Sequence, residues 1–311
     1  MSLRHSNDIK AEAKRLGFFT CGIAKADRVS QEEENHLRSW LADGMNADME
    51  WMNNYLDKRL DPRLLMDGLQ SIVSVALSYT PRKTLPANEP QIAAYALGLD
   101  YHDVMKQKLR LLAASIYGEA VENANYRVFV DSGPVLERYW AEQAGLGWIG
   151  KNRQLIIPHA GSMFFLGELF LDFETEYDRP AVNRCGNCTK CIDRCPTHAL
   201  SFSRKFDSNL CLSYQTIENR KELSQEAKKH MGNVIYGCDR CQQVCPWNRF
   251  AEPNPTPEFQ PKEELLNMTI DKWKQLSVED YRRLFKGSAV KRVKYRGLMR
   301  NISNLFCNFE P

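Results

Sequence analysis

Apolar residues recur at helical spacing and at strand spacing in alternate segments of the first 178 residues. Apolar residues three or four positions apart indicate helices, and short apolar runs rich in β-branched residues indicate strands. The pattern predicts helices over residues 11–16, 31–42, 101–120 and 135–144. It predicts strands over residues 21–24, 71–79, 126–130, 154–157 and 163–171. Strands that alternate with helices favour an α/β (α+β) domain in which helices cover a sheet.

The character of the sequence changes near residue 180. Residues 179–252 are rich in cysteines, prolines and short turns, and their end overlaps a proline-rich segment, 251–261. Two further helices are predicted, over residues 270–276 and 278–285. We therefore expect three parts: an α/β domain over 1–178, a cysteine-rich module over 179–252 and a helical tail over 253–311.

The composition is that of a packed protein without an export signal. The 311 residues are 43% hydrophobic and 26% charged, which is typical of folded domains. The first residues lack the apolar stretch of a secretory signal. The most apolar segment, 155–171, is interrupted by His159, Gly161 and Glu168, so it is too polar to span a membrane. We expect a cytoplasmic protein.

Positive charge is concentrated near the C-terminus. Residues 281–300 contain eight basic residues and no acidic one, while the whole chain has a net charge of only +3. A local basic surface can bind a polyanion, although such a run is also typical of a solvated helix face. The candidate contacts to a polyanion are Lys291, Arg292, Lys294 and Arg296.

Eight of the ten cysteines lie between residues 185 and 245. Four form the run Cys-x2-Cys-x2-Cys-x3-Cys-Pro of bacterial two-cluster ferredoxins, and a second set repeats it with its first cysteine displaced. The fourth cysteine of such a run binds the other cluster. The spacing predicts two 4Fe–4S clusters, one held by Cys185, Cys188, Cys191 and Cys245, the other by Cys195, Cys211, Cys238 and Cys241. Two structural zinc sites are the alternative, which this spacing disfavours.

Together with this cysteine run, three segments resemble the epoxyqueuosine reductase family: DYHD at 100–103, VDSGPVLER at 130–138 and GLGWIGKN at 145–152. The resemblance extends from about residue 5 to residue 304. It implies an oxidoreductase that converts epoxyqueuosine in tRNA to queuosine, with cobalamin bound between the α/β domain and the ferredoxin module. The resemblance also suggests a monomer. We expect a small reductant protein, such as a ferredoxin or a flavodoxin, as the electron donor. Many family members have a helical repeat region after the ferredoxin module, and we expect little of it in this chain.

The resemblance assigns roles to individual residues. Asp131 is expected to be the proton donor and to contact cobalamin, with its pKa raised by burial. Position alone would favour a helix-capping role for Asp131, and Ser132 is then the expected cap. The other expected cobalamin contacts are Arg59, Arg138, Lys151 and Asn152. His102 lies in an incomplete cobalamin-ligand motif, because Met105 replaces its glycine, and we expect a hydrogen-bonded histidine at a helix start.

Two other functions remain open from the sequence. A corrinoid-dependent reductive dehalogenase would share the cofactors, but such enzymes usually carry a twin-arginine signal and have no use for a basic tail. A non-catalytic ferredoxin-type electron-transfer protein would bind clusters and no corrinoid. Gly145, Gly147 and Gly150 do not indicate a dinucleotide site, because Trp148 and Ile149 lead into a strand instead of a helix.

Overall fold

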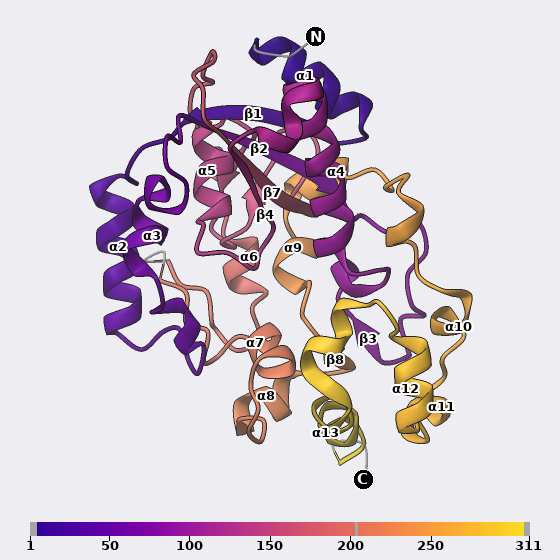
Figure 1. The fold of residues 1–311 in the computed structure, drawn as a ribbon. Helices are drawn as coiled ribbons and strands as arrows, with labels where there is room; N and C mark the ends of the chain where they lie inside the picture. Colours follow the sequence, from indigo (N-terminus) through magenta and orange to yellow (C-terminus); the bar gives the residue numbers. More distant parts are fainter. Residues whose placement is uncertain (1–4, 203–204, 308–311) are drawn as a thin grey trace.

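The computed structural model describes residues 5–202 and 205–307. A four-stranded antiparallel sheet organises the N-terminal part of the chain (Figure 1). Its strand order is β1 (Thr20–Lys25), β2 (Ser71–Ser78), β7 (Phe164–Leu171) and β4 (Tyr126–Phe129). The prediction of these four strands is confirmed. The fold class is mixed α and β, and this main sheet contains no parallel pair.

Helices cover both faces of this sheet. Alternate residues of a strand point to opposite faces. Val73 and Val75 of β2 therefore pack in a core with α1 (Ser6–Arg15) and α4 (Tyr101–Tyr117). Ile72 and Ala76 pack in a second core with α5 (Glu137–Gln143) and the helices α2 (Gln31–Ala42) and α3 (Leu56–Leu60). Burial on both faces explains why β2 and β7 are apolar along most of their length.

Local capping explains where several of these helices begin and end. Helix α2 has the predicted bounds, and the Ser30 side chain accepts a hydrogen bond from Glu33 N at its start. Helix α4 ends at Tyr117, earlier than predicted, because Gly118 adopts a positive φ of 59° and a 3₁₀ helix, Gly118–Asn123, follows. Helix α5 starts at Glu137 and not at residue 135, after a turn.

A two-stranded hairpin, β5 (Trp148–Ile149) and β6 (Leu155–Ile156), lies outside the main sheet. The strand predicted over residues 154–157 is thus present as β6, which pairs with β5, and Ile157 forms an isolated bridge with Gly161. A side chain at Gly147 would meet the backbone oxygen of Ile156 at 2.1 Å, so the hairpin requires glycine there. Trp148 and Ile149 do lead into a strand, as expected.

The cysteine-rich segment contains short helices and one strand: α6 (Lys190–Asp193), α7 (Leu212–Ile217), α8 (Gln225–His230), β8 (Val234–Tyr236) and α9 (Arg240–Gln243). Helices α6 and α9 are single turns that pack against each other, one from each cysteine set. Strand β8 pairs in parallel with β3 (Gln91–Ile92). This pairing ties the segment to the N-terminal half of the chain.

The C-terminal helices complete a third hydrophobic core. They are α10 (Glu263–Leu266), α11 (Ile270–Lys274), α12 (Val278–Leu284) and α13 (Lys294–Cys307). Helices α11 and α12 confirm two predictions, and α13 lies within the helical tail expected over 253–311, although its own bounds were not predicted. The core also includes side chains from residues 85–97 and 212–236. Residues from all three expected parts contribute side chains to this core. The expected domain limits at 178 and 252 therefore stay predictions. No helix among residues 5–202 and 205–307 combines the length and apolarity that crossing a membrane demands.

Candidate functional site

A cavity of about 550 Å³ lies between the sheet and the cysteine-rich segment. Its lining on the sheet side includes Asp131, Glu137, Arg138 and Asn152, and on the other side Cys195, Cys211, Cys238 and Cys241. Residues expected to handle protons and residues expected to bind a redox group therefore line one space. Such convergence of polar groups in a large cavity is typical of active sites.

Asp131 lies in the turn that joins β4 to α5. Its backbone has a φ of 55°, a left-handed conformation that non-glycine residues rarely adopt. Its side chain is 62% exposed and lines the cavity. The helix-capping interpretation is wrong for both Asp131 and Ser132, because the N-cap position of α5 is Leu136 and no side chain caps it. Ser132 Oγ instead donates to Val130 O and accepts from Lys106 Nζ.

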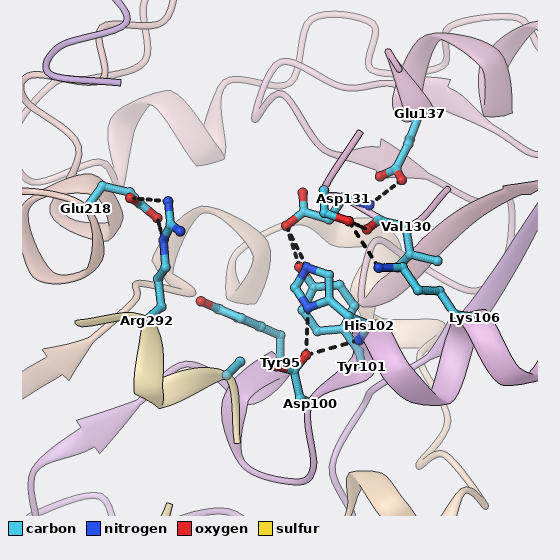
Figure 2. A network of polar contacts seen from close by, with 12 residues as sticks. Tyr95, Asp100, Tyr101, His102, Lys106, Val130, Asp131, Glu137, Glu218 and Arg292 are labelled. Carbon is cyan, nitrogen blue, oxygen red and sulfur yellow. Dashed lines mark hydrogen bonds and ion pairs between the residues drawn. The ribbon is translucent and has the colours of Figure 1, made fainter. Parts of the chain in front are cut away.

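Asp131 receives two polar contacts from the start of α4 (Figure 2). Tyr101 Oη donates a hydrogen bond of 2.7 Å to Asp131 Oδ2, and His102 Nε2 lies 3.4 Å from the same oxygen. On the other side of the ring, His102 Nδ1 lies 2.6 Å from Asp100 Oδ1. Asp100 also caps α4, since its side chain accepts from His102 N. His102 is thus a hydrogen-bonded histidine at a helix start, as predicted, and it bridges two carboxylates.

These contacts reverse the expected ionisation of Asp131. Partial loss of water at the cavity wall raises the pKa of Asp131, but hydrogen bonds from His102 and Tyr101 and the positive charge of His102 outweigh this effect, so the pKa falls below its ordinary value. The expectation of a raised pKa is therefore wrong. Hydrogen bonds to Asp100 and Asp131 raise the pKa of His102 to about 9. At neutral pH the pair is a carboxylate and an imidazolium.

Two other carboxyl groups near Asp131 do have raised pKa values. Burial and the charge of Asp131 raise the pKa of Glu137 to about 8, and Glu137 Oε1 accepts a hydrogen bond from Asp131 N. Glu168 on β7 is fully buried, has one oxygen without a hydrogen-bond partner within the described chain, and also has a raised pKa. The sequence analysis missed both residues. The available signal was Glu168 itself, a carboxyl group within an otherwise apolar strand.

Three of the four other expected cofactor contacts line the same cavity: Arg59, Arg138 and Asn152. Arg59 is only 7% exposed, and its Nε has no hydrogen-bond partner within residues 5–202 and 205–307. Asn152 Nδ2 is likewise buried and unpaired there. Because an unpaired buried donor costs about 1–3 kcal/mol, these two donors fit a ligand that presents acceptor oxygens. The residues therefore fit the amide- and phosphate-rich edge of a corrinoid.

Lys151 lies apart from these three residues. Its Nζ donates to Gly186 O at 2.7 Å and to Cys188 O at 3.0 Å. It lines a second cavity of about 330 Å³, which is also lined by Cys185, Cys188, Cys191 and Cys245. Lys151 is thus positioned to support a cysteine loop, away from the large cavity.

The eight cysteines fall into two spatial groups around the two cavities. The groups have the same members as the two cluster-ligand sets expected from spacing. Burial, with the nearby thiols Cys185 and Cys245, raises the pKa of Cys191 to about 11. No three His, Cys, Asp or Glu side chains in the described ranges converge as ligands of a single metal ion. Each group instead surrounds a cavity with space for a group of several atoms.

The basic tail reaches the neighbourhood of Asp131. The side chains of Lys291, Arg292, Lys294 and Arg296 are exposed. Arg292 pairs with both carboxylate oxygens of Glu218, at 2.8 and 2.9 Å (Figure 2). The hydrogen bonds that Arg292 donates to Glu218 raise the pKa of Arg292, and the charge of Asp131 contributes to the same shift. Arg292 of the basic tail therefore lies close enough to Asp131 for their charges to interact.

Comparison with known proteins gives a family match for the cysteine-rich segment and another for the segment that contains Asp131. Residues 184–248 match the family described as "4Fe-4S double cluster binding domain". Residues 59–132 match the family described as "Epoxyqueuosine reductase QueG, DUF1730". The first match covers all eight clustered cysteines, from Cys185 to Cys245.

Full-length relatives and solved structures agree. The chain is 45% identical to an epoxyqueuosine reductase of Cellulophaga algicola (97% of this chain, 98% of that one) and 47% identical to one of Leadbetterella byssophila (96% and 97%). It resembles a crystal structure of epoxyqueuosine reductase with an epoxyqueuosine-modified tRNA-Tyr stem loop, at a TM-score of 0.89 and 29% identity (97% of this chain, 81% of that one). A Bacillus subtilis structure, whose aspartate-bearing catalytic loop is swung out of the active site, has a TM-score of 0.86, 28% identity and the same coverage. The chain therefore belongs to the epoxyqueuosine reductase family of oxidoreductases.

Proposed function

We propose that this protein reduces epoxyqueuosine to queuosine at the wobble position of tRNA. Removing the epoxide oxygen as water consumes two electrons and two protons. The observation that carries the proposal is the large cavity, which has Asp131, with its partners Tyr101 and His102, on one wall and four cysteines of a double-cluster segment on the other. Electrons and protons can thus reach one substrate.

Cobalamin is the proposed cofactor of the large cavity. When bound, it would supply a reduced cobalt centre that can attack or reduce the epoxide. Arg59 and Asn152 would donate their unpaired N–H groups to its oxygens, and Arg138 would add a cation at the same wall. A full set of such contacts would orient the cofactor and exclude water.

The eight cysteines are the proposed ligands of two 4Fe–4S clusters. Cys195, Cys211, Cys238 and Cys241 would hold the inner cluster, because they line the large cavity. Cys185, Cys188, Cys191 and Cys245 would hold the outer cluster beside Lys151. Single electrons would then pass from the outer cluster to the inner one and on to the cavity.

Asp131 is the proposed proton donor to the epoxide oxygen, and His102 is its proposed proton source. Because Asp131 is ionised at rest, it must first take a proton from a neighbouring acid. His102 carries one at neutral pH, with Nε2 at 3.4 Å from Asp131 Oδ2. Protonation makes the departing oxygen a better leaving group. Glu137, which lines the cavity and has a raised pKa, can supply the second proton.

The basic tail is the proposed tRNA contact. Lys291, Lys294 and Arg296 have free charges facing solvent within the described chain, and phosphates bind such cations without sequence preference. Arg292 would act close to the cavity, with its charge shared with Glu218. An anticodon base can be splayed out of its loop and enter a pocket.

The test is Asp131→Asn in the protein loaded with cobalamin and clusters. Iron and cobalamin content should persist, while conversion of epoxyqueuosine-containing tRNA to queuosine collapses. Near-normal conversion would remove Asp131 from the mechanism. A wild-type protein that holds clusters but no corrinoid would instead support an electron-transfer protein, and one that dehalogenates but leaves this tRNA unchanged would support a dehalogenase.

A further inference from the structure

The smaller cavity, beside the outer group of cysteines, has a distinctive charge. Its lining contains three cations, Lys151, Arg184 and Arg249, and no aspartate or glutamate. Arg184 and Arg249 are exposed, and neither forms an ion pair with any residue that the structure describes. Lys151 is occupied by two backbone carbonyls of the cysteine loop. Two of the three charges are therefore available to a partner.

Aromatic side chains connect this surface to a cysteine. Phe250 is 36% exposed and lies 5.5 Å from the ring of His159, and Arg249 packs over the Phe250 ring at 4.5 Å. Behind them Trp247 contacts Trp148, with ring centroids 4.9 Å apart. Trp148 Nε1 donates to Cys185 Sγ at 3.4 Å. The patch thus has an apolar centre, a cationic edge and a short distance to the outer thiols.

We propose that this patch, formed by His159, Arg184, Arg249 and Phe250, is the docking surface for a small acidic carrier protein that delivers electrons one at a time. The inference rests on the proposed function, since it requires a cluster at the outer cysteines. The large cavity belongs to substrate and cofactor, so the outer group is the one that a protein partner can approach. Complementary charge would steer an acidic carrier to it and orient its redox centre.

Each encounter transfers one electron. The carrier is oxidised by one electron, and the outer cluster is reduced from the 2+ to the 1+ state. No bond to hydrogen forms or breaks in this step. Two encounters supply the two electrons that epoxide removal requires. The local positive charge also favours the reduced, more negative cluster.

The experiment mixes the anaerobic, cluster-loaded protein with reduced flavodoxin in a stopped-flow instrument and follows the loss of cluster absorption. Neither tRNA nor cobalamin turnover enters this measurement. Arg184→Glu/Arg249→Glu should lower the second-order rate constant on the order of 10-fold at low ionic strength, and added salt should abolish the difference. Arg184→Gln/Arg249→Gln should have an intermediate effect.

Two controls separate docking from damage to the cluster. Lys14→Glu/Arg110→Glu changes the net charge by the same amount, at exposed positions on α1 and α4 outside the cavity lining. Flavodoxin should reduce the clusters of this variant at the wild-type rate. Reduction by dithionite, a small anion that needs no docking surface, should slow far less in the charge-reversed variant than reduction by flavodoxin does. An unchanged rate constant with flavodoxin, or an equal slowing with dithionite, would overturn the docking surface. Absence of cluster absorption in the wild type would overturn the cluster assignment, and with it the proposed function.

Discussion

The two walls of the large cavity differ in whether their ionisable side chains have partners of opposite charge within the protein. On the sheet wall, His102 lies between Asp100 and Asp131, and Tyr101 donates to Asp131, so these charges have partners within the protein. On the cysteine wall, burial and neighbouring thiols raise the pKa of Cys211 to about 11. No cation lies among the causes of that shift. The Asp100, His102 and Asp131 side chains are thus paired without a ligand, whereas the cysteines need a metal to become thiolates.

This difference separates two kinds of variant. A change on the cysteine wall should remove metal and therefore folding energy, because metal binding and folding are coupled. A change on the sheet wall should leave the cofactors in place and alter proton transfer. The predictions below test that separation, from the largest effect to the smallest.

Cys211→Ser should have the largest effect. We expect the iron content to fall by about half and conversion of the modified tRNA to be lost, because the inner cluster loses a ligand beside the cavity. Iron analysis and the visible spectrum provide the measurement. Cys21→Ser is the matched control, because Cys21 belongs to neither cysteine group, and it should retain full iron. Full iron content in Cys211→Ser would contradict the ligand set.

His102→Gln tests the proton source. Turnover should fall by roughly 10²- to 10⁴-fold, which is typical for loss of general acid catalysis, while iron and cobalamin content stay unchanged. In the wild type, activity should decline as the pH rises through about 9, where His102 loses its proton. The variant should lack this alkaline decline. A variant that is slow but has the wild-type pH profile would show that His102 only positions Asp131.

The same two walls explain what could be predicted from sequence. The cysteine groups depend on short-range spacing in tight loops, so the run itself indicated which thiols come together. The start of α2 was also predictable, since Ser30 caps it within one turn. Asp131 was located because it follows a strand and lies in a recognisable segment.

The ionisation of Asp131 depends on contacts that no local pattern reveals. Tyr101 and His102 come from another helix, and the register that brings them to β4 is a property of the folded sheet. Burial alone suggested a raised pKa, and the tertiary hydrogen bonds reversed it. Pairing of β3 with β8, which joins chain from the expected domains, was likewise invisible in the sequence. Long-range contacts thus account for most of what was missed.

Glu137→Gln should change how the stability of the protein depends on pH and should leave the cofactor content unchanged. The pKa of Glu137 is raised from 4.5 to about 8, so the folded state binds its proton more tightly than the unfolded state. The resulting stability is complete below pH 4.5 and is lost as the pH rises through about 8. As the pH rises from 4.5 to above 8, the Tm of the variant should therefore fall less than the Tm of the wild type, by a few degrees. Glu119→Gln, at an exposed site, should follow the wild-type curve.

The basic tail should give the smallest effects, and they should differ between its residues. Lys294 is exposed and forms no ion pair within residues 5–202 and 205–307, whereas the charge of Arg292 is shared with Glu218. Lys294→Gln should therefore weaken tRNA binding more than Arg292→Gln does. It should also lower the slope of log binding constant against log salt concentration by about one, which corresponds to one phosphate contact. Binding measured over a salt series is the test. Charge reversal at both positions that leaves affinity unchanged at low salt would exclude this surface. A larger loss for Arg292→Gln would instead indicate that tRNA displaces Glu218 and uses the arginine beside the cavity.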